Sequence, residues 1–170
     1  MQSTIQELQS VLLRTIPLTQ HIGLRVISYE AGLLVLKAPL APNANHLQTA
    51  FAGSLNALAT LAGWGQVWLI LKELDLPGEI VIQDSSSNYL RPVSNDFVAA
   101  CYRPEQEQIA RFSTGLKKKG IARIELSANI YANDTVAMTF KGRYVISTKR
   151  ETAPIVTVQA HAISNTENER

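Results

Sequence analysis

The chain is short of charge and nearly without cysteine. Asp, Glu, Lys and Arg make up 18% of its 170 residues, and the formal net charge is +2 at pH 7. So small a charge gives no overall field that would attract nucleic acid, and an anionic partner must meet a local patch. The single cysteine, Cys101, excludes a disulfide within the chain and fits a reducing cytoplasm. We expect Cys101 to fill a buried position in an apolar strand.

Signals for export and for common cofactors are absent as well. Residues 1–17 lack the basic start and the continuous apolar core of a signal peptide. The sequence has no phosphate-binding glycine loop, no Cys/His spacing typical of zinc sites and no dinucleotide fingerprint. We therefore expect a cytoplasmic protein with no metal, no bound organic cofactor and no nucleic-acid partner.

One long segment contains no charge. Residues 47–71 include no Asp, Glu, Lys or Arg, and residues 50–71 are mostly apolar. That length is enough to cross a bilayer. Polar residues, three glycines and many alanines within the segment favour instead a helix enclosed inside a soluble protein. We predict this central helix over residues 50–74, with a Pro-Gly pair beyond its end.

The rest of the chain is mainly strand-like. Apolar residues at helical spacing predict a short amphipathic helix over residues 3–15, and a polar excursion of helical character is expected over residues 104–112. Hairpin turns are expected at Ala31-Gly32 and at Asn133-Asp134. Strands are predicted over residues 21–29, 33–38, 79–90, 96–103, 121–131 and 135–147.

The last two predicted strands show the clearest alternation of apolar and polar residues, so each has one buried and one solvated face. One long buried helix and five or six antiparallel strands have few packing solutions. The strands must curl around the helix, because a flat sheet cannot bury it on all sides. This is the hotdog arrangement, of the α+β fold class. We predict a single hotdog domain over residues 1–147 and a poorly packed C-terminal tail over residues 148–170.

A polar loop leads directly into the predicted central helix. The first turn of a helix offers unpaired backbone N–H groups and the positive end of the helix dipole. Gly53, in that turn, would let a substrate carbonyl approach the backbone closely. Such donors suit the oxyanion that forms when a thioester carbonyl is attacked or enolised. The alternative is that Gly53 only permits tight packing, since every helix has such an end.

Three motifs resemble those of a hotdog thioesterase-like family. They read APLAPNANH (38–46), TAFAGSLNALATLAGWG (49–65) and IVIQDSSSNYLRPV (80–93). With the closing strand KGRYVIS, the resemblance covers about residues 16–147. Members of this family occur alone or fused behind an acetyltransferase domain, and some are malonyl–acyl-carrier-protein decarboxylases. In that group, the asparagine that matches Asn45 is the residue implied to act on the substrate thioester.

The chain departs from other hotdog thioesterases at the residues that would deliver water. Those enzymes place a carboxylate on the central helix or a His-Gly-Gly at its start. Aligned on FAGSLNALAT, Phe51 stands at the histidine position and Thr60 at the carboxylate position. Hydrolysis gains from a base or nucleophile, whereas loss of CO2 from a malonyl thioester needs only donors on the enolate oxygen. The missing acid favours decarboxylation, with Asn45 and the Gly53 N–H as catalytic donors.

Further side chains of the loop, helix and following strand are predicted to bind substrate. Asp84 is expected to share a face with Ile80 and Ile82, either in a pocket or at a subunit contact, where it is the nearest carboxylate for hydrolysis. The alternative role for Asn45 is to hold a turn of the loop. The alternative for His46 is an exposed position in solvent. The predicted substrate-binding residues are Asn43, His46, Phe51, Ser54, Thr60 and Asp84.

A dense basic cluster lies after the polar excursion. Lys117, Lys118 and Lys119, with Arg123, are predicted to meet the phosphates of coenzyme A or the acidic surface of a carrier protein. The alternative is a solvated loop before a strand.

We expect an enzyme that acts on small acyl thioesters. Malonyl–acyl-carrier-protein decarboxylation through an oxyanion hole is the first hypothesis, and hydrolysis of an acyl-CoA or acyl-carrier thioester is the second. The third is a non-catalytic acyl-binding module. The expected partners are a carrier-protein or coenzyme A thioester and further copies of the chain, as a dimer or tetramer, because sheet edges are usually covered and hotdog relatives pair their sheets. No membrane partner is expected.

Overall fold

The computed structural model describes residues 2–148, so all of the predicted tail except Thr148 lies outside the described residues. The boundaries of the predicted domain stay a prediction. The described residues form four α-helices, one 3-10 turn and six strands. In chain order these are α1 Gln2–Thr15, α2 Leu18–His21, β1 Arg25–Glu30, β2 Leu33–Ala38, the 3-10 turn Ala41–Asn43, α3 Ala52–Glu73, β3 Glu79–Tyr89, β4 Phe97–Tyr102, α4 Gln106–Lys119, β5 Ile121–Ala132 and β6 Thr135–Ser147.

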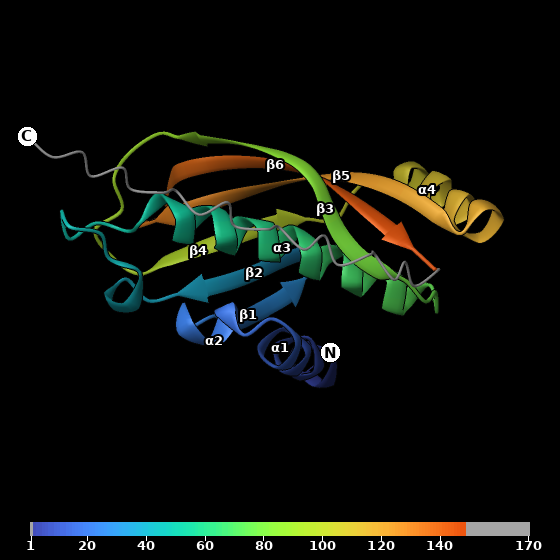
Figure 1. Ribbon diagram of the computed structural model, residues 1–170, viewed down its shortest axis with the longest axis horizontal. Coiled ribbons are helices and arrows are strands. Elements are labelled where there is room, and N and C mark those ends of the chain that lie inside the picture. The colour runs from blue at the N-terminus through green and yellow to red at the C-terminus, as the bar shows by residue number, and fades with distance from the viewer. Residues whose placement is uncertain (1, 149–170) are drawn as a thin grey trace, which may run out of the picture.

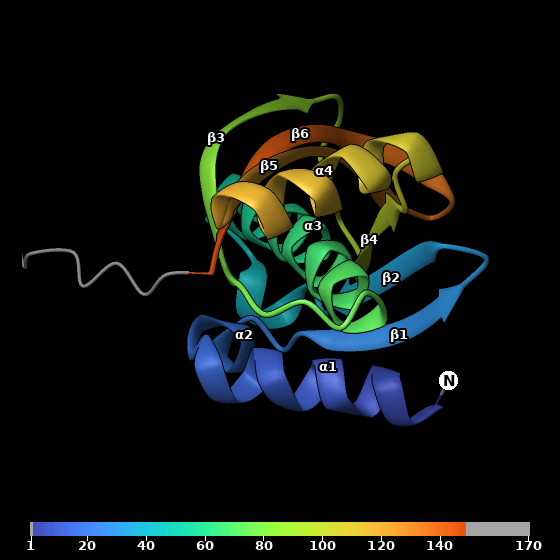
Figure 2. The ribbon, with the colours of Figure 1, turned by 90° about the vertical axis from the view of Figure 1, so that its right-hand side faces the viewer.

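The six strands make one antiparallel sheet in the order β1-β2-β4-β5-β6-β3. The sheet curls over α3, which runs along its concave side, while α1 lies beyond β1 at the lower edge (Figures 1 and 2). In β5 the buried residues alternate with exposed ones, as the sequence predicted. The architecture is the α+β hotdog fold.

The helix α3 is the core of the molecule. By length and composition it would suffice to cross a membrane, yet 67% of its most apolar 18-residue window is buried by the rest of the chain. Its long contact with the sheet depends on close approach at Gly63, where an added Cβ would lie 2.2 Å from the Tyr144 hydroxyl. That hydroxyl donates a hydrogen bond of 2.8 Å to the carbonyl of Thr60. This is the environment of an enclosed helix, as predicted from the polar residues and glycines.

Both predicted turns are confirmed. Ala31 and Gly32 adopt positive φ angles of 47° and 80°, and Asn133 and Asp134 adopt 47° and 59°. Two consecutive positive φ angles are the geometry of the tight hairpin turns that match strand twist. Cys101 is fully buried in β4, also as predicted, and burial raises the pKa of its thiol to about 12.

Two elements differ from the sequence prediction. The start of the predicted strand over residues 21–29 is instead the end of α2, because buried Thr19 donates to the carbonyls of Leu12 and Ile16 and ties this segment to α1. From Gln106 on, the polar segment predicted over residues 104–112 belongs to helix α4. This helix ends at Lys119, seven residues later than predicted. Its buried residues Ile109, Phe112 and Leu116 have helical spacing and pack toward β5.

Candidate functional site

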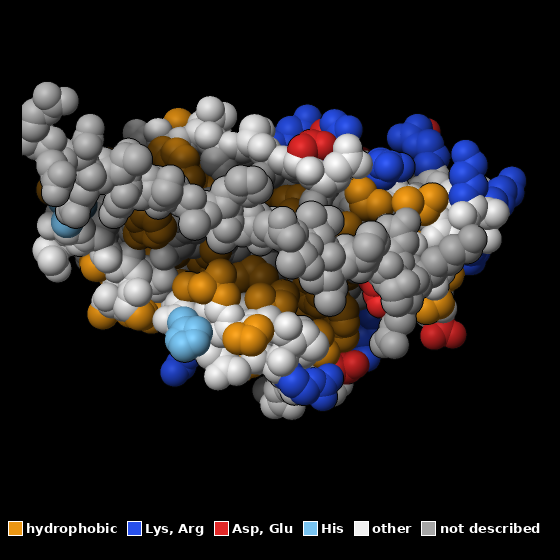
Figure 3. Space-filling view, in the orientation of Figure 1, with side chains coloured by type: hydrophobic (Ala, Val, Ile, Leu, Met, Phe, Trp, Pro, Cys, Tyr) orange, Lys and Arg blue, Asp and Glu red, His pale blue; other side chains and the backbone are white. Residues whose placement is uncertain are grey.

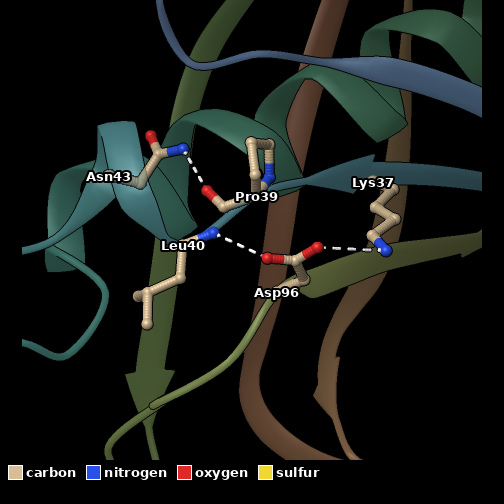
Figure 4. Close-up of polar contacts among 5 residues, drawn as sticks. All are labelled: Lys37, Pro39, Leu40, Asn43 and Asp96. Carbon is tan, nitrogen blue, oxygen red and sulfur yellow. Dashed lines mark hydrogen bonds and ion pairs between the residues drawn. The ribbon is translucent and has the colours of Figure 1, made fainter.

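The loop before α3 is fixed by a set of buried and surface hydrogen bonds (Figure 4). Asp96 accepts a hydrogen bond of 3.0 Å from the Leu40 N–H and forms an ion pair of 3.1 Å with Lys37. These two partners lower the pKa of the Asp96 carboxyl, the Leu40 N–H contributing most. The Asn43 amide donates to the carbonyls of Pro39 (2.8 Å) and Ile22 (2.9 Å). The entry to α3 is therefore tied to β2, β4 and α2.

Asn43 was predicted to bind substrate, but its amide nitrogen is committed to this anchoring. The side chain is 2% exposed, and its Oδ1 has no hydrogen-bond partner within residues 2–148. Its backbone carbonyl accepts a hydrogen bond of 2.7 Å from the N–H of Phe51. This bond fixes the position of Phe51, the residue that precedes α3. Asn43 acts in the structure as an anchor of the loop.

Asn45 organises the next turn of the same loop. Its Oδ1 accepts hydrogen bonds from the N–H groups of Leu47 (2.8 Å) and Thr49 (3.2 Å), and its Nδ2 donates to the Thr49 hydroxyl (2.9 Å). Asn45 therefore holds a turn of the loop, as its alternative role predicted. An amide nitrogen has two hydrogens, and the second has no partner among the described residues.

The first turn of α3 carries two free donors. Phe51 precedes the helix with φ −63° and ψ 131°, and its apolar side chain makes no capping hydrogen bond. The N–H groups of Ser54 and Leu55 donate to the Phe51 carbonyl. Those of Ala52 and Gly53 have no acceptor in the part of the chain that the structure describes. Both point out of the helix N-terminus, at the positive end of its dipole.

Two clefts flank this turn. The first, here the Asn45 cleft, has a volume of about 370 Å³ and the second, the Phe51 cleft, about 400 Å³. Asn45 and Gly53 line different clefts, although we predicted them in one site; Ala52 lines the cleft that contains Asn45. The Asn45 cleft is lined by Asn45, Thr49, Ala50, Ala52, Leu55, Tyr89, Leu90, Arg91, Pro92 and Val93. The Phe51 cleft is lined by Leu18, His21, Ile22, Pro42, Asn43, Phe51, Gly53, Ser54 and Ala57.

The Phe51 ring explains the glycine at position 53. A Cβ on Gly53 would lie 2.2 Å from a carbon of this ring, which is itself 56% exposed. The close approach that glycine permits is therefore to Phe51, where we had expected a substrate carbonyl. The tight-packing alternative for Gly53 is the one present, and a ligand of the Gly53 N–H has to approach past this ring.

The end of β3 supplies two cleft residues that the sequence did not single out. The Tyr89 hydroxyl donates to the Ala52 carbonyl at 3.3 Å, so the tyrosine lies across the first turn of α3. Arg91 is exposed, and among the described residues it is the only charged side chain that lines the Asn45 cleft. Both belong to the third family-like motif, which marked the segment but not the two side chains.

The prediction for the face of Asp84 was wrong. A bulge between Ile82 and Asp84 shifts the register of β3 against β6, and a one-residue slip moves side chains to the opposite face. Asp84 is paired with the exposed Arg143, with 3.6 Å between their charged groups, away from α3. Ser87 faces the helix instead and donates to the Asn56 side chain at 2.7 Å.

The remaining loop and helix candidates do not line the Asn45 cleft. His46 is exposed and lines neither cleft. This agrees with the alternative prediction that His46 lies in solvent. Thr60 lies two turns into α3, with its carbonyl engaged by Tyr144. Ser54 lines the Phe51 cleft.

The predicted basic cluster lies far from both clefts. Lys117, Lys118 and Lys119 form the last turn of α4, close to the start of β5 and far from the N-terminus of α3 in Figure 1. Figure 3 shows Lys and Arg side chains gathered at that end. A 22-residue helix is about 33 Å long, and it separates the cluster from the clefts. Arg123 donates to Gln83 at 2.9 Å on the outer face of the sheet.

Known proteins share both the sequence pattern and the fold. Residues 5–148 match the family described as "Putative thioesterase (yiiD_Cterm)". A protein of unknown function from Chlorobaculum tepidum is 34% identical, with a TM-score of 0.82 over 85% of this chain and 94% of that chain. A putative thioesterase from Shewanella oneidensis is 30% identical, with a TM-score of 0.80 over 88% of this chain and 100% of that chain.

A more distant likeness supports the fold alone. A thioesterase from Haemophilus influenzae is 16% identical, with a TM-score of 0.67 over 86% of this chain and 94% of that chain. The family match extends from α1 to the end of β6 and includes the loop and helix turn that form the Asn45 cleft. The chain therefore belongs to the hotdog-fold putative thioesterase family.

Proposed function

We propose that the protein decarboxylates malonyl thioesters in the Asn45 cleft, at the N-terminus of α3. The observation that carries this proposal is the pair of uncommitted N–H groups on Ala52 and Gly53. They point out of the first turn of α3, beside the Asn45 cleft. None of the described residues that line this cleft is Asp or Glu. Such a site offers hydrogen-bond donors to a developing oxyanion, and its lining within residues 2–148 has no carboxylate to activate water.

The reaction needs little else from the protein. The bond between C2 and the carboxylate carbon breaks, CO2 leaves, and the electron pair moves into the thioester to give an enolate. The negative charge develops on the thioester oxygen, where preorganised N–H donors stabilise it more than they stabilise the substrate. The Ala52 N–H and the free Asn45 amide hydrogen supply the donors from the Asn45 cleft, whereas Gly53 lines the Phe51 cleft. Solvent then protonates C2 and yields the acetyl thioester.

Hydrolysis of an acyl thioester is the second candidate. It is favoured by the description of the family and by the name of the Shewanella relative. Hydrolysis would require a base from outside the residues that line the Asn45 cleft. A thioester-binding module without catalysis is the remaining alternative.

Product analysis separates the three functions. Purified protein is incubated with malonyl- and acetyl-phosphopantetheine thioesters, both free and on a carrier protein, and products are followed by mass spectrometry and thiol release. We expect malonyl thioester to become acetyl thioester, with CO2 and no free thiol. Thiol release from either substrate would support hydrolysis and contradict the proposal. Binding of either thioester without turnover would support the binding module.

We also propose that two copies of the chain join along β3. This strand is the last in the sheet order, with β6 on one side and no other strand of residues 2–148 beyond it. Long open edges are usually covered in natural proteins. Exposed apolar side chains cluster on and just after β3, namely Val81, Ile82, Tyr89 and Leu90. Since Tyr89 and Leu90 also line the Asn45 cleft, a partner on this edge would border the site.

The carrier of the acyl group is proposed only as a class. Coenzyme A and acyl carrier protein present the same pantetheine thioester, and the cleft residues do not distinguish between them. The cytoplasm stays the predicted location.

A further inference from the structure

Arg91 lies beside the proposed acyl site and has no counter-ion among residues 2–148. Its guanidinium forms no ion pair or side-chain hydrogen bond among the described residues, as is also true of Arg14 and Arg25, which line neither cleft. It follows directly on β3, between exposed Leu90 and Pro92, and all three line the Asn45 cleft.

The lining of the Asn45 cleft is asymmetric in charge. Asn45 and Thr49 are neutral, the first turn of α3 contributes positive dipole ends, and Arg91 adds a full positive charge. No acidic residue of the described chain lines the cleft to balance it. A neutral acyl group has no use for this cation, whereas an acyl group that ends in a carboxylate does.

We infer that Arg91 binds the carboxylate of the acyl group, so that the cleft selects thioesters of short dicarboxylic acids. This inference rests on the proposed function, because it places the thioester at the first turn of α3. Guanidinium and carboxylate groups are matched for two parallel hydrogen bonds. In a malonyl group one methylene separates the carboxylate from the thioester carbonyl. The two groups are therefore close enough together to fit in a cleft of about 370 Å³.

The phosphate of the pantetheine arm is the other anion of such a substrate. It lies at the far end of the arm from the thioester, whereas Arg91 lines the same small cleft as Ala52, whose N–H is proposed to meet the thioester oxygen. Distance therefore favours the acyl carboxylate as the partner of Arg91.

The role of Arg91 is substrate selection and not acceleration of the chemical step. The carboxylate charge moves away from the guanidinium as CO2 forms, so the contact is strongest before the transition state. An interaction that is stronger in the ground state lowers KM and does not raise kcat. Because Arg91 is exposed, water screens the pair and its effect is about fivefold to tenfold.

The test compares Arg91→Gln with the wild type and with Arg14→Gln, which removes an exposed arginine of α1 far from the cleft. The dissociation constants of two stable thioether analogues of the pantetheine thioester are measured by calorimetry, one ending in a carboxylate and one neutral. Arg91→Gln is expected to weaken the carboxylate analogue about fivefold to tenfold and to leave the neutral analogue unchanged. Arg91→Lys should restore part of the loss, and Arg14→Gln should change neither constant.

The kinetic readout uses the malonyl thioester. Arg91→Gln should raise KM by a similar factor without lowering kcat. An equal loss for both analogues, or no loss for either, overturns the inference. An effect that requires the phosphate of the arm, seen by repeating the titration with unphosphorylated pantetheine analogues, also overturns it. If the wild type binds the carboxylate analogue through Arg91 but turns over no malonyl thioester, the inference holds and the proposed decarboxylation fails.

Discussion

The Asn45 side chain uses its two ends differently. Its Oδ1 accepts from two backbone N–H groups of the loop, while one Nδ2 hydrogen has no acceptor in the described chain. Replacement by alanine would remove both functions together. Aspartate keeps the shape and the accepting oxygen but has no N–H to offer, so it separates support of the loop from donation to substrate.

We therefore predict that Asn45→Asp folds normally and loses decarboxylation. The loop hydrogen bonds to Leu47 and Thr49 remain possible, so the melting temperature should change by only a few degrees. The substrate donor is replaced by a negative charge that repels the acyl carboxylate, and turnover of malonyl thioester should fall about 100-fold. Thermal melting and initial rates on the same preparation measure both effects. Wild-type turnover in Asn45→Asp would show that the amide hydrogen is not used.

Asp96 makes the support of the same loop dependent on pH. The Leu40 N–H and Lys37 lower its pKa below the ordinary value of 3.8. A carboxyl whose pKa is lower in the folded state adds stability above its unfolded pKa and loses it as pH falls through the folded pKa. Asp96→Asn should therefore be less stable than the wild type at pH 6, and the difference should shrink as the pH falls below 3.8 and the carboxyl becomes protonated in the folded state. Urea unfolding at several pH values measures this, and a difference that persists in acid would contradict it.

At the residue scale, the sequence predicted the free donors at the helix start because any uncapped first turn leaves them. It also offered the turn-holding role of Asn45 as an alternative. It could not predict the face of Asp84, since the bulge after Ile82 depends on pairing with β6. Nor could it identify Arg91 as a cleft residue, because that requires knowing that the end of β3 lies beside the start of α3.

The helix α3 makes a close contact with β6 at Gly63. At Gly63 an added Cβ would lie 2.2 Å from the Tyr144 hydroxyl, which must move and lose its bond to the Thr60 carbonyl. At Gly115 in α4, by contrast, the nearest atom to an added Cβ is 3.7 Å away, on Ala122. The two helical glycines therefore differ in the space they leave.

We predict opposite effects of alanine at these two positions. Gly63→Ala should lower the free energy of unfolding by about 1–3 kcal/mol through overpacking. Gly115→Ala should raise it by about 0.5–1 kcal/mol, because alanine is the better helix former. Chemical denaturation of both variants measures the pair. Equal effects would show that the contact between α3 and β6 is looser than described.

At the scale of elements, alternation of apolar and polar residues predicted β5 and β6 well, and the long charge-free segment predicted α3. Periodicity was less reliable elsewhere. It failed at α2, whose single turn is held by Thr19 through contacts with α1 that no local pattern reveals. It also stopped α4 too early. The three lysines that end this helix favour its C-terminus through the dipole, yet in sequence they resemble a solvated loop.

At the scale of the whole molecule, the open edge of β3 predicts association. We expect the wild type to sediment with twice or four times the mass of one chain. Val81→Lys adds a charge to the exposed apolar edge and should shift the distribution toward the monomer. Ile121→Lys, at a partly exposed position of β5 away from that edge, should not. A monomeric wild type at micromolar concentration in sedimentation velocity would contradict the prediction.

The hotdog architecture followed from one charge-free helix and a set of alternating strands, so the sequence contained enough to predict it. The distribution of charge over the molecule did not follow. Lys117, Lys118 and Lys119 lie in the last turn of α4, far from the start of α3 (Figure 1), whereas residues of that first turn line both clefts. Local patterns give no distances between elements, and the length of α3 determines this one.

The proposed oxyanion site is tested by removing one backbone donor from α3. Ala52 is the first helical residue, and Phe51 before it has the extended conformation that proline requires, so Ala52→Pro deletes the N–H without disturbing the helix. Gln106→Pro makes the same change at the start of α4 and is the control. We predict that kcat for malonyl thioester falls about 100-fold or more in Ala52→Pro, with unchanged stability, and stays at wild-type level in Gln106→Pro. Full decarboxylation by a folded Ala52→Pro would contradict this prediction.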